Sequence, residues 1–424
     1  MTDPSPVGEE SAPFAEELAE AAALDRADPL AWAREQFHTG AQDPPYLDGN
    51  SLGRLPRRSL IRLLQVVEEE WGHGLVRSWA GWMGMPTRVG DRLGEVLLGA
   101  GPGQVVVADS TSVNLYKLAA AALDALPERS VVVTDRANFP TDRYLLAGLT
   151  AGRRLKLRSV DFDEVMGPTP GAVGSAVGRD TALVLLSHVD YRSGALADMA
   201  GISAVVRDAG ALTLWDLSHS VGAVPITLDE SRADLAAGCT YKYLNAGPGS
   251  PAFLYVSGHL QRRLQQPIWG WMGKRDPFAM EEPYSPQEGI GSFLSGTPQI
   301  LGLALVEEGV ELLAELGIER VRAKSLALTD HLVGLVDGRL EPLGFRLATP
   351  RQGERRGSQV TLRHPRAREL CERLDRSGEV VLDFRPPDRV RLGCAAPTTS
   401  FTDLVRAVGS LARSAAELVS EYAG

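Results

Sequence analysis

The sequence predicts an α/β fold, with a large domain built on a mostly parallel sheet and a smaller C-terminal α+β domain. Between about residues 104 and 256, short apolar stretches alternate with helical ones, which is the pattern of strands joined by helical crossovers. The pattern changes near residue 300, after a loop-rich segment at 269–299. A chain of 424 residues is also long enough for two or three domains with a large core.

The expected elements follow in chain order. Helices are predicted at about 14–40 and 57–72, on either side of the turn-forming stretch "YLDGNSLGRLP". Strands are predicted at 104–110, 130–135, 181–187, 211–216 and 251–256, and helices at 112–126, 141–150, 167–178 and 198–209. Two helices over about 301–336 precede a strand–strand–helix–strand–strand–helix order ending at 421. We therefore expect an N-terminal tail and arm (1–45), a large domain (46–300) and a small domain (301–424).

Composition excludes several classes of function. The net charge of −10, with acidic and basic residues interspersed, argues against nucleic acid or an anionic membrane as the main partner. No apolar run reaches the length that spans a membrane, and the acidic N-terminus lacks the form of a signal peptide. Cys239, Cys371 and Cys394 are widely spaced, so we expect no disulfide framework, no metal site and a cytoplasmic setting.

Two polar motifs directly follow predicted strands. "DSTSVN" ends a strand and opens a helix, so its hydroxyls and free N–H groups suit a phosphate, although they could serve only to cap the helix. "WDLSH" places Asp216 and His219 after the next-to-last strand. The alternatives there are an aspartate that caps a helix and a histidine that is satisfied in the core.

A third motif, "GCTYKYLNAGPG", places Lys242 between two tyrosines and before a tight Gly-Pro-Gly turn. A buried ammonium is costly unless it is paired or neutralised, and the alternative is a strand-edge lysine that extends into solvent. Pyridoxal 5′-phosphate needs a lysine for an imine, an acid for its ring nitrogen and a phosphate cradle. Lys242, which lies 26 residues and one further strand after Asp216, completes that set with the "DSTSVN" motif.

The chain resembles the kynureninase family of fold type I (aspartate-aminotransferase-like) pyridoxal-phosphate enzymes. The resemblance runs from about Tyr46 to about Leu411. Its motifs, all in the family's order, are "YLDGNSLG", "WGHGLVRSW", "DSTSVNLYK", "NFPTDRY", "SHVDYRSG", "WDLSHSVGA", "GCTYKYLNAGPG", "GWMG", "FLSGTP" and "VRLG".

The resemblance implies a role for each matching residue. Lys242 would form the imine, Asp216 would pair with the pyridine nitrogen and His219 would lie beside the cofactor. Phe139 would stack on the cofactor ring, and Asp142 would close the loop that carries both residues over that ring. Thr111, Ser112 and Tyr241 would bind the phosphate, and Ser187 would belong to the cofactor shell. Ser51 and Arg391 would bind the substrate. Trp271 and Thr297 would reach the cofactor from the neighbouring subunit of a homodimer with shared sites.

The implied reaction is hydrolytic cleavage of the Cβ–Cγ bond of L-kynurenine or 3-hydroxykynurenine, giving anthranilate or 3-hydroxyanthranilate and L-alanine. Such a hydrolase of carbon–carbon bonds in ketonic substances belongs to the kynurenine pathway of tryptophan catabolism and NAD biosynthesis. Lys242, once released, would act as the base, and Tyr241 is the expected proton donor.

Two departures from the family bear on specificity. Lys274 follows "GWMG" where histidine is usual, and "APTTSF" (Ala396 to Phe401) replaces "PLY". A kynureninase-like hydrolase of a ring-modified kynurenine in secondary metabolism is therefore an alternative. A cysteine desulfurase-like lyase is another, although its nucleophilic cysteine has no good candidate here. A non-catalytic cofactor-binding protein is a third, and it has no need of the imine lysine.

Overall fold

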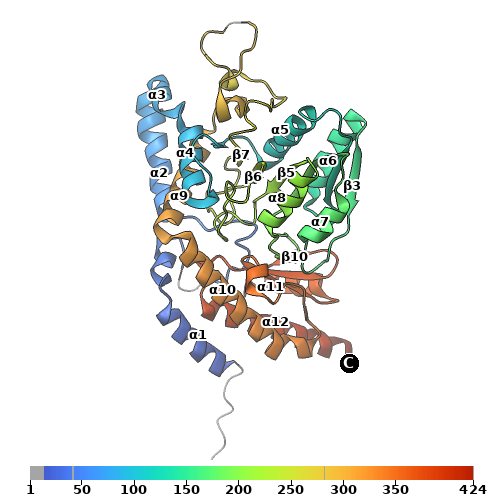
Figure 1. The fold of residues 1–424 in the computed structure, drawn as a ribbon. Coiled ribbons are helices and arrows are strands. Elements are labelled where there is room, and N and C mark those ends of the chain that lie inside the picture. The colour runs from blue at the N-terminus through green and yellow to red at the C-terminus, as the bar shows by residue number, and fades with distance from the viewer. Residues whose placement is uncertain (1–13, 41–42, 281, 424) are drawn as a thin grey trace, which may run out of the picture.

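A seven-stranded sheet forms the centre of the computed structural model, which describes residues 14–40, 43–280 and 282–423 (Figure 1). The part of the predicted N-terminal tail at 1–13 lies outside the described residues. The strand order is β1-β7-β6-β5-β4-β2-β3. The strands are β1 (Val105–Val107), β2 (Val131–Asp135), β3 (Lys156–Val160), β4 (Thr181–Ser187), β5 (Leu212–Asp216), β6 (Leu235–Gly238) and β7 (Phe253–Val256).

The sheet is mostly parallel, which confirms the predicted fold class. Strands β3, β2, β4, β5 and β6 run parallel to one another, whereas β7 is antiparallel to both β6 and β1. Both faces are covered, so successive apolar residues of a strand enter different cores: Val105 and Val107 enter one and Val106 enters the other. Burial on both faces explains why these strands are continuous apolar runs without a polar alternation.

Helices cover both faces of this sheet. α5 (Thr111–Asp124) and α6 (Pro140–Arg153) pack on one face. The other face is covered by α4 (Met85–Leu93), α8 (Met199–Asp208) and α9 (Ile300–Leu316), with α7 (Pro170–Ala176) packed on α8. The crossovers return every parallel strand in the same direction, so the polar motifs that follow the strands lie at one edge of the sheet.

A second, four-stranded antiparallel sheet lies in the C-terminal part, in the order β10-β11-β9-β8. Its strands are β8 (Arg346–Leu347), β9 (Gln359–Arg363), β10 (Asp383–Arg385) and β11 (Arg389–Gly393). α10 (Ile318–Leu335), α11 (Ala367–Ser377) and α12 (Phe401–Ala423) share its core, and α1 (Ala15–Ala27) packs on α12. The order of elements is the predicted one, and the domain boundaries at 45 and 300 stay predictions.

Several helical predictions differ from the structure. The helix predicted at 14–40 is interrupted, because α1 ends before Asp28, which takes an extended ψ of 117° in front of Pro29. A residue before proline is driven out of the helical region, so the chain restarts as a short 3₁₀ segment, η1 (Ala31–Gln36). The helix predicted at 57–72 consists of α2 (Arg57–Gln65) and a π-helix, η2 (Val66–Gly74).

The sequence predicts no residue range for two of the strands. β3 is an edge strand with the charged, partly exposed sequence "KLRSV", and β6 is the short "LAAG", which is poor in β-branched residues. The remaining helical segments are η3 (Leu75–Ser78), α3 (Trp79–Trp82), η4 (Gly94–Leu98), η5 (Trp271–Gly273), η6 (Gly289–Phe293), η7 (Val336–Leu340), η8 (Glu341–Leu343) and η9 (Gly353–Arg355).

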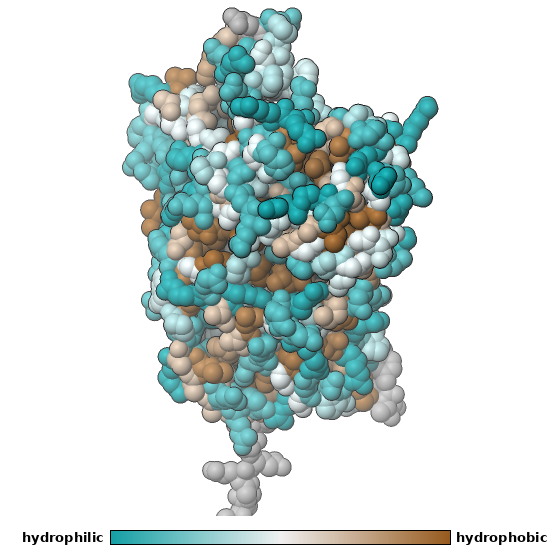
Figure 2. All heavy atoms as spheres, in the orientation of Figure 1, coloured by the Kyte–Doolittle hydropathy of each residue, from teal (hydrophilic) through white to brown (hydrophobic). Residues whose placement is uncertain are grey.

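One face of the molecule is mainly polar. On the face shown in Figure 2, apolar side chains lie in separate patches among hydrophilic ones. No helix within the described part of the chain has the length and apolar character needed to cross a membrane.

Candidate active site

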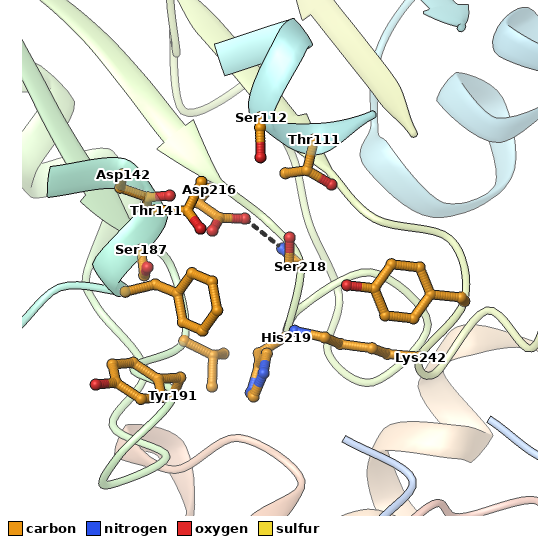
Figure 3. Close-up of a pocket in the computed structure, with 13 residues that line it drawn as sticks. Thr111, Ser112, Thr141, Asp142, Ser187, Tyr191, Asp216, Ser218, His219 and Lys242 are labelled. Carbon is orange, nitrogen blue, oxygen red and sulfur yellow. Dashed lines mark hydrogen bonds between the residues drawn. The ribbon is translucent and has the colours of Figure 1, made fainter. Parts of the chain in front are cut away.

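A pocket lies where the parallel strands end. Because β1 and β6 are both antiparallel to β7, the ends of β1, β2, β4, β5 and β6 meet at one edge of the sheet. The pocket there holds about 600 Å³ of empty space, its open mouth included. It is lined by Thr111, Ser112, Phe139, Thr141, Asp142, Ser187, Val189, Tyr191, Asp216, Ser218, His219, Tyr241 and Lys242 (Figure 3). The sequence had singled out all of these except Thr141, Val189, Tyr191 and Ser218.

One end of the pocket is formed by the start of α5. Ser110 caps this helix, its Oγ accepting a hydrogen bond from the Val113 N–H at 3.4 Å. Thr111 and Ser112 follow in the first turn, and Figure 3 shows them together at the same end of the pocket. The first-turn N–H groups of a helix have no partner within the helix, and the helix dipole favours negative charge there. This end of the pocket therefore suits a phosphate group.

Two carboxylates lie on the side wall of the pocket. Asp216 ends β5, and its Oδ1 accepts the Ser218 N–H at 2.8 Å, while Oδ2 accepts no hydrogen bond from any described residue. Asp142, from the first turn of α6, accepts a hydrogen bond from Asn138 Nδ2 at 3.1 Å. Burial, and then the charge of Asp216, raise the pKa of Asp142 well above its ordinary value. Asp142 therefore holds a proton more readily than an ordinary carboxyl group.

Lys242 follows β6 and extends into the pocket. Its Nζ lies 5.9 Å from the ring centre of Phe139 and 6.0 Å from that of Tyr241. In the described part of the chain, no group accepts a hydrogen bond from this Nζ and no carboxylate lies within 4.0 Å of it. The amine is thus held between aromatic walls, without a counter-ion, and is available to bond a ligand.

The turn before α2 fixes the backbone of this lysine. The Gly53 N–H donates to the carbonyl of Tyr241 at 2.8 Å. A Cβ at Gly53 would overlap the carbonyl oxygen of Lys242, so only glycine allows this close approach. The "YLDGNSLG" turn is in this way packed directly behind the pocket.

His219 forms the floor of the pocket and is buried. Its Nδ1 lies 3.2 Å from Oε1 of Gln359, which is the first residue of β9 in the second sheet. Burial lowers the pKa of His219 well below its ordinary value, and the charges of Lys242 and Arg391 lower it further. The imidazole is therefore neutral at neutral pH, and it connects the pocket to the C-terminal sheet.

Arg391 and Ser51 lie behind the pocket wall and do not line it. The Arg391 guanidinium is fully buried and donates to Ser51 Oγ at 2.9 Å and to the carbonyl of Tyr191 at 2.8 Å. It also pairs with Asp383 at 2.5 Å. Since Tyr191 itself lines the pocket, Arg391 is separated from the cavity by one residue.

Trp271 and Thr297 are not brought to the pocket of their own chain. Trp271 packs edge-on against Phe278, with ring centres 5.7 Å apart, and Thr297 is exposed. Lys274 also lies away from the pocket, with its Nζ 3.4 Å from the carbonyl of Asp276. The "APTTSF" stretch, which begins at the buried Ala396, leads into α12 and does not line the pocket either.

Of the residues that the sequence did not single out, Tyr191 is the most informative. Its ring packs edge-on against Phe139 at 5.3 Å between ring centres. It lies in the "SHVDYRSG" motif after β4, and Ser218 lies in "WDLSH" after β5, so both belong to stretches that directly follow strands of the sheet. Their positions in loops that directly follow strands of a parallel sheet were therefore the signal that could have identified both as pocket residues.

The pocket fits pyridoxal phosphate. The unused oxygen of Asp216 is an acceptor for a protonated ring nitrogen, and the amine of Lys242 has no competing partner. Phe139 supplies an aromatic face, and the start of α5 supplies N–H groups for a phosphate. Within residues 14–40, 43–280 and 282–423, no group of three or more His, Cys, Asp or Glu side chains could hold a metal ion.

The chain is similar to known proteins over most of its length. Residues 321–411 match the family model described as "Kynureninase C-terminal domain". The kynureninase of Burkholderia pseudomallei is 46% identical over 400 residues, covering 92% of this chain and 94% of that protein. The kynureninase of Pseudomonas fluorescens is 44% identical over 394 residues, covering 91% and 92% respectively.

Solved structures show the fold. A cysteine desulfurase from Thermococcus onnurineus superimposes with a TM-score of 0.79 at 16% identity, over 90% of this chain and 97% of that one. A C-DES mutant with glycine covalently linked to its pyridoxal-phosphate cofactor superimposes with a TM-score of 0.77 at 19% identity, over 89% and 98%. The architecture is thus that of fold type I pyridoxal-phosphate enzymes.

Proposed function

The chain belongs to the kynureninase family, and we propose that its strand-end pocket performs the family reaction with the residues described above. The protein is a pyridoxal-phosphate-dependent hydrolase that cleaves the Cβ–Cγ bond of L-kynurenine or 3-hydroxykynurenine, releasing L-alanine and the corresponding anthranilate. The observation that supports the residue roles best is the pairing in one pocket of an amine without a counter-ion, Lys242, with a carboxylate that has an unused oxygen, Asp216.

The residues that would hold the cofactor come from the ends of five strands, β1, β2, β4, β5 and β6. Pyridoxal phosphate, when bound, supplies an electrophilic aldehyde carbon and a protonated ring that withdraws electrons from an amino-acid substrate. Asp216 would keep the ring nitrogen protonated, and Phe139 would stack on the ring. Thr111, Ser112 and Tyr241 would bind the phosphate, with Ser187, Asp142 and His219 completing the surroundings.

Two neighbouring residues, Lys242 and Tyr241, would transfer the protons. We assign to the amine of Lys242 the removal of the proton at the substrate Cα, because the amine lines the pocket and no described carboxylate lies within 4.0 Å of it. Burial raises the pKa of Tyr241, so its hydroxyl keeps its proton at neutral pH. That hydroxyl can then donate a proton to the substrate carbon from which the anthranilate departs.

The substrate α-carboxylate is assigned to Arg391, with Ser51 beside it. This assignment is supported by the bonds of Arg391 to Ser51 Oγ and to the carbonyl of Tyr191, which lines the pocket, and by the effect of its charge on His219. The planar guanidinium suits a carboxylate better than an ammonium would. In this structure the guanidinium pairs with Asp383, so substrate would join or displace that carboxylate.

The desulfurase alternative has no support in this chain. All three cysteines are free and buried, and burial raises the pKa of Cys371 to about 12 and that of Cys394 to about 12. A nucleophilic cysteine has to be exposed and readily ionised. The free thiols also support a reducing, cytoplasmic setting, which we propose for the enzyme.

Incubating the cofactor-loaded protein with kynurenine and 3-hydroxykynurenine tests the proposed function. We expect equal amounts of L-alanine and an anthranilate, detected by fluorescence and amino-acid analysis. Kynurenines with other ring substituents tested in parallel will show whether Lys274 and the "APTTSF" stretch favour a modified ring. Release of alanine from none of these compounds would contradict the assignment.

We further propose a homodimer in which each pocket is completed by Trp271 and Thr297 of the other copy. Both residues lie away from the pocket of their own chain. A long strip of exposed apolar residues on α2, η2 and η3 supports an interface, since patches of this kind mark association surfaces. The strip consists of Leu60, Ile61, Leu64, Val67, Trp71, Leu75 and Val76, of which Ile61 is 70% exposed and Val76 is 76% exposed.

Placing two charges on this strip should separate the dimer. The double variant Ile61→Glu/Leu64→Glu is expected to elute as a monomer in size-exclusion chromatography with light scattering, with activity reduced roughly tenfold or more because each pocket loses its shared residues. Val419→Glu is the matched control, since Val419 is 65% exposed on α12. A wild-type monomer, or a fully active monomeric variant, would refute the shared site.

A further inference from the structure

We propose that Lys117 is a positioning residue for the phosphate-binding end of the pocket. It would act by neutralising Asp109 and anchoring it, an inference that rests on the proposed use of pyridoxal phosphate. The Lys117 side chain is fully buried in α5, two turns after the helix begins. Its Nζ donates to Asp109 Oδ2 at 2.6 Å and to the carbonyl of Phe293 at 2.8 Å. Neither Lys117 nor Asp109 lines the pocket.

Asp109 is the residue that turns the chain from β1 into α5. Its φ of 53° lies in the left-handed region, where residues other than glycine are strained. Its carbonyl accepts the Ala252 N–H at 2.9 Å, and its carboxylate accepts a hydrogen bond from Lys117 Nζ at 2.6 Å. Because Ser110 and Thr111 follow immediately, the direction in which their N–H groups and hydroxyls point depends on how Asp109 is held.

The charge of this pair matters as well as its geometry. An unpaired carboxylate one residue before the helix cap would repel a bound phosphate and oppose the helix dipole's attraction for it. Burial lowers the pKa of Lys117, but its hydrogen bond to Asp109 and the charge of that carboxylate act in the opposite direction and favour the ammonium form. The fully buried ammonium then cancels the charge of the partly exposed carboxylate. The Phe293 carbonyl lies on η6 and gives the ammonium a second fixed partner, which holds the Lys117 amine in its buried position.

The test compares binding of pyridoxal phosphate with binding of pyridoxal, which lacks the phosphate. Apo-protein is titrated with each compound and the dissociation constants are taken from absorbance. For Lys117→Met we expect pyridoxal phosphate to bind about tenfold or more weakly, with pyridoxal binding changed little, since only the phosphate meets the uncompensated Asp109. A merely structural defect would weaken both compounds alike.

Lys324→Met is the matched control. Lys324 and Asp28 form another buried pair with the same Nζ–Oδ2 distance of 2.6 Å, and neither residue lines the pocket. Breaking it should lower thermal stability, as breaking the Lys117 pair should, but leave both dissociation constants unchanged. The double variant Asp109→Asn/Lys117→Met removes both charges, so it is expected to fold and to recover most of the affinity for pyridoxal phosphate.

The possible results separate this inference from the proposed function. Equal weakening of both compounds in Lys117→Met, or no weakening of either, would overturn the role of Lys117 while leaving the cofactor assignment intact. If the double variant binds pyridoxal phosphate as poorly as the single variant, the electrostatic argument is wrong. A wild-type protein that binds neither compound would overturn the proposed function and this inference with it.

Discussion

Replacing Lys242 by alanine should reduce turnover by about 10³-fold or more and remove the visible absorbance of the cofactor–lysine linkage. The amine is expected to serve twice, first in holding the cofactor aldehyde and then in moving the proton at the substrate Cα. No other lysine lines the pocket, so no neighbour can substitute for it. Nζ makes no hydrogen bond or ion pair with any described residue, so the loss of function should come with little loss of thermal stability.

The matched control is Lys156→Ala, at the exposed start of the edge strand β3. That variant should keep both the absorbance and the turnover of the wild type. Circular dichroism and thermal melting will show whether Lys242→Ala is folded. Retention of the visible band by a folded Lys242→Ala protein would contradict the role assigned to this residue.

Asp216→Asn should lower kcat by about 10²- to 10³-fold while the cofactor stays bound. The asparagine can still accept the Ser218 N–H, so the local backbone is preserved. A neutral amide, however, cannot hold the ring nitrogen in its protonated form, and the electron-withdrawing power of the cofactor would be lost. Loss of the charge would also remove one cause of the raised pKa of Asp142, so Asp142 would ionise more readily.

Asp234→Asn is the control for this substitution. Asp234 and Asp216 are each 7% exposed. Like Asp216, Asp234 accepts a backbone N–H at 2.8 Å, here from Thr213, but it does not line the pocket. Its variant should keep kcat, whatever happens to stability. Equal kcat values for Asp216→Asn and wild type would show that Asp216 does not face the ring nitrogen.

The site residues at strand ends could be predicted because parallel strands bring their carboxyl ends to one edge. Asp216 and Lys242 lie 26 residues apart in the sequence, yet β5 and β6 are neighbours, and both side chains line one pocket. The apolar runs of β2, β4 and β5 are equally clear, since both faces of those strands are buried. Local sequence therefore predicts strands and strand-end residues well where the sheet fixes both the burial of the strand residues and the direction of the strands.

Other features depend on contacts that local sequence does not encode. The break at Asp28 was signalled by Pro29, but the buried pair of Asp28 with Lys324 joins segments almost 300 residues apart. Likewise Arg391 was singled out by its motif, whereas its position behind Tyr191 and its ion pair with Asp383 follow from how the second sheet packs. Phe293, whose carbonyl accepts a hydrogen bond from Lys117, ends the short 3₁₀ helix η6 in a segment without any periodic pattern.

One covalent attachment point decides whether this account is right. Borohydride reduction of the cofactor-loaded protein, followed by proteolysis and mass spectrometry, will locate the pyridoxyl group. We predict a single modified peptide, carrying the label at Lys242. A label on any other lysine, or a reduced protein without a label, would contradict the central claim.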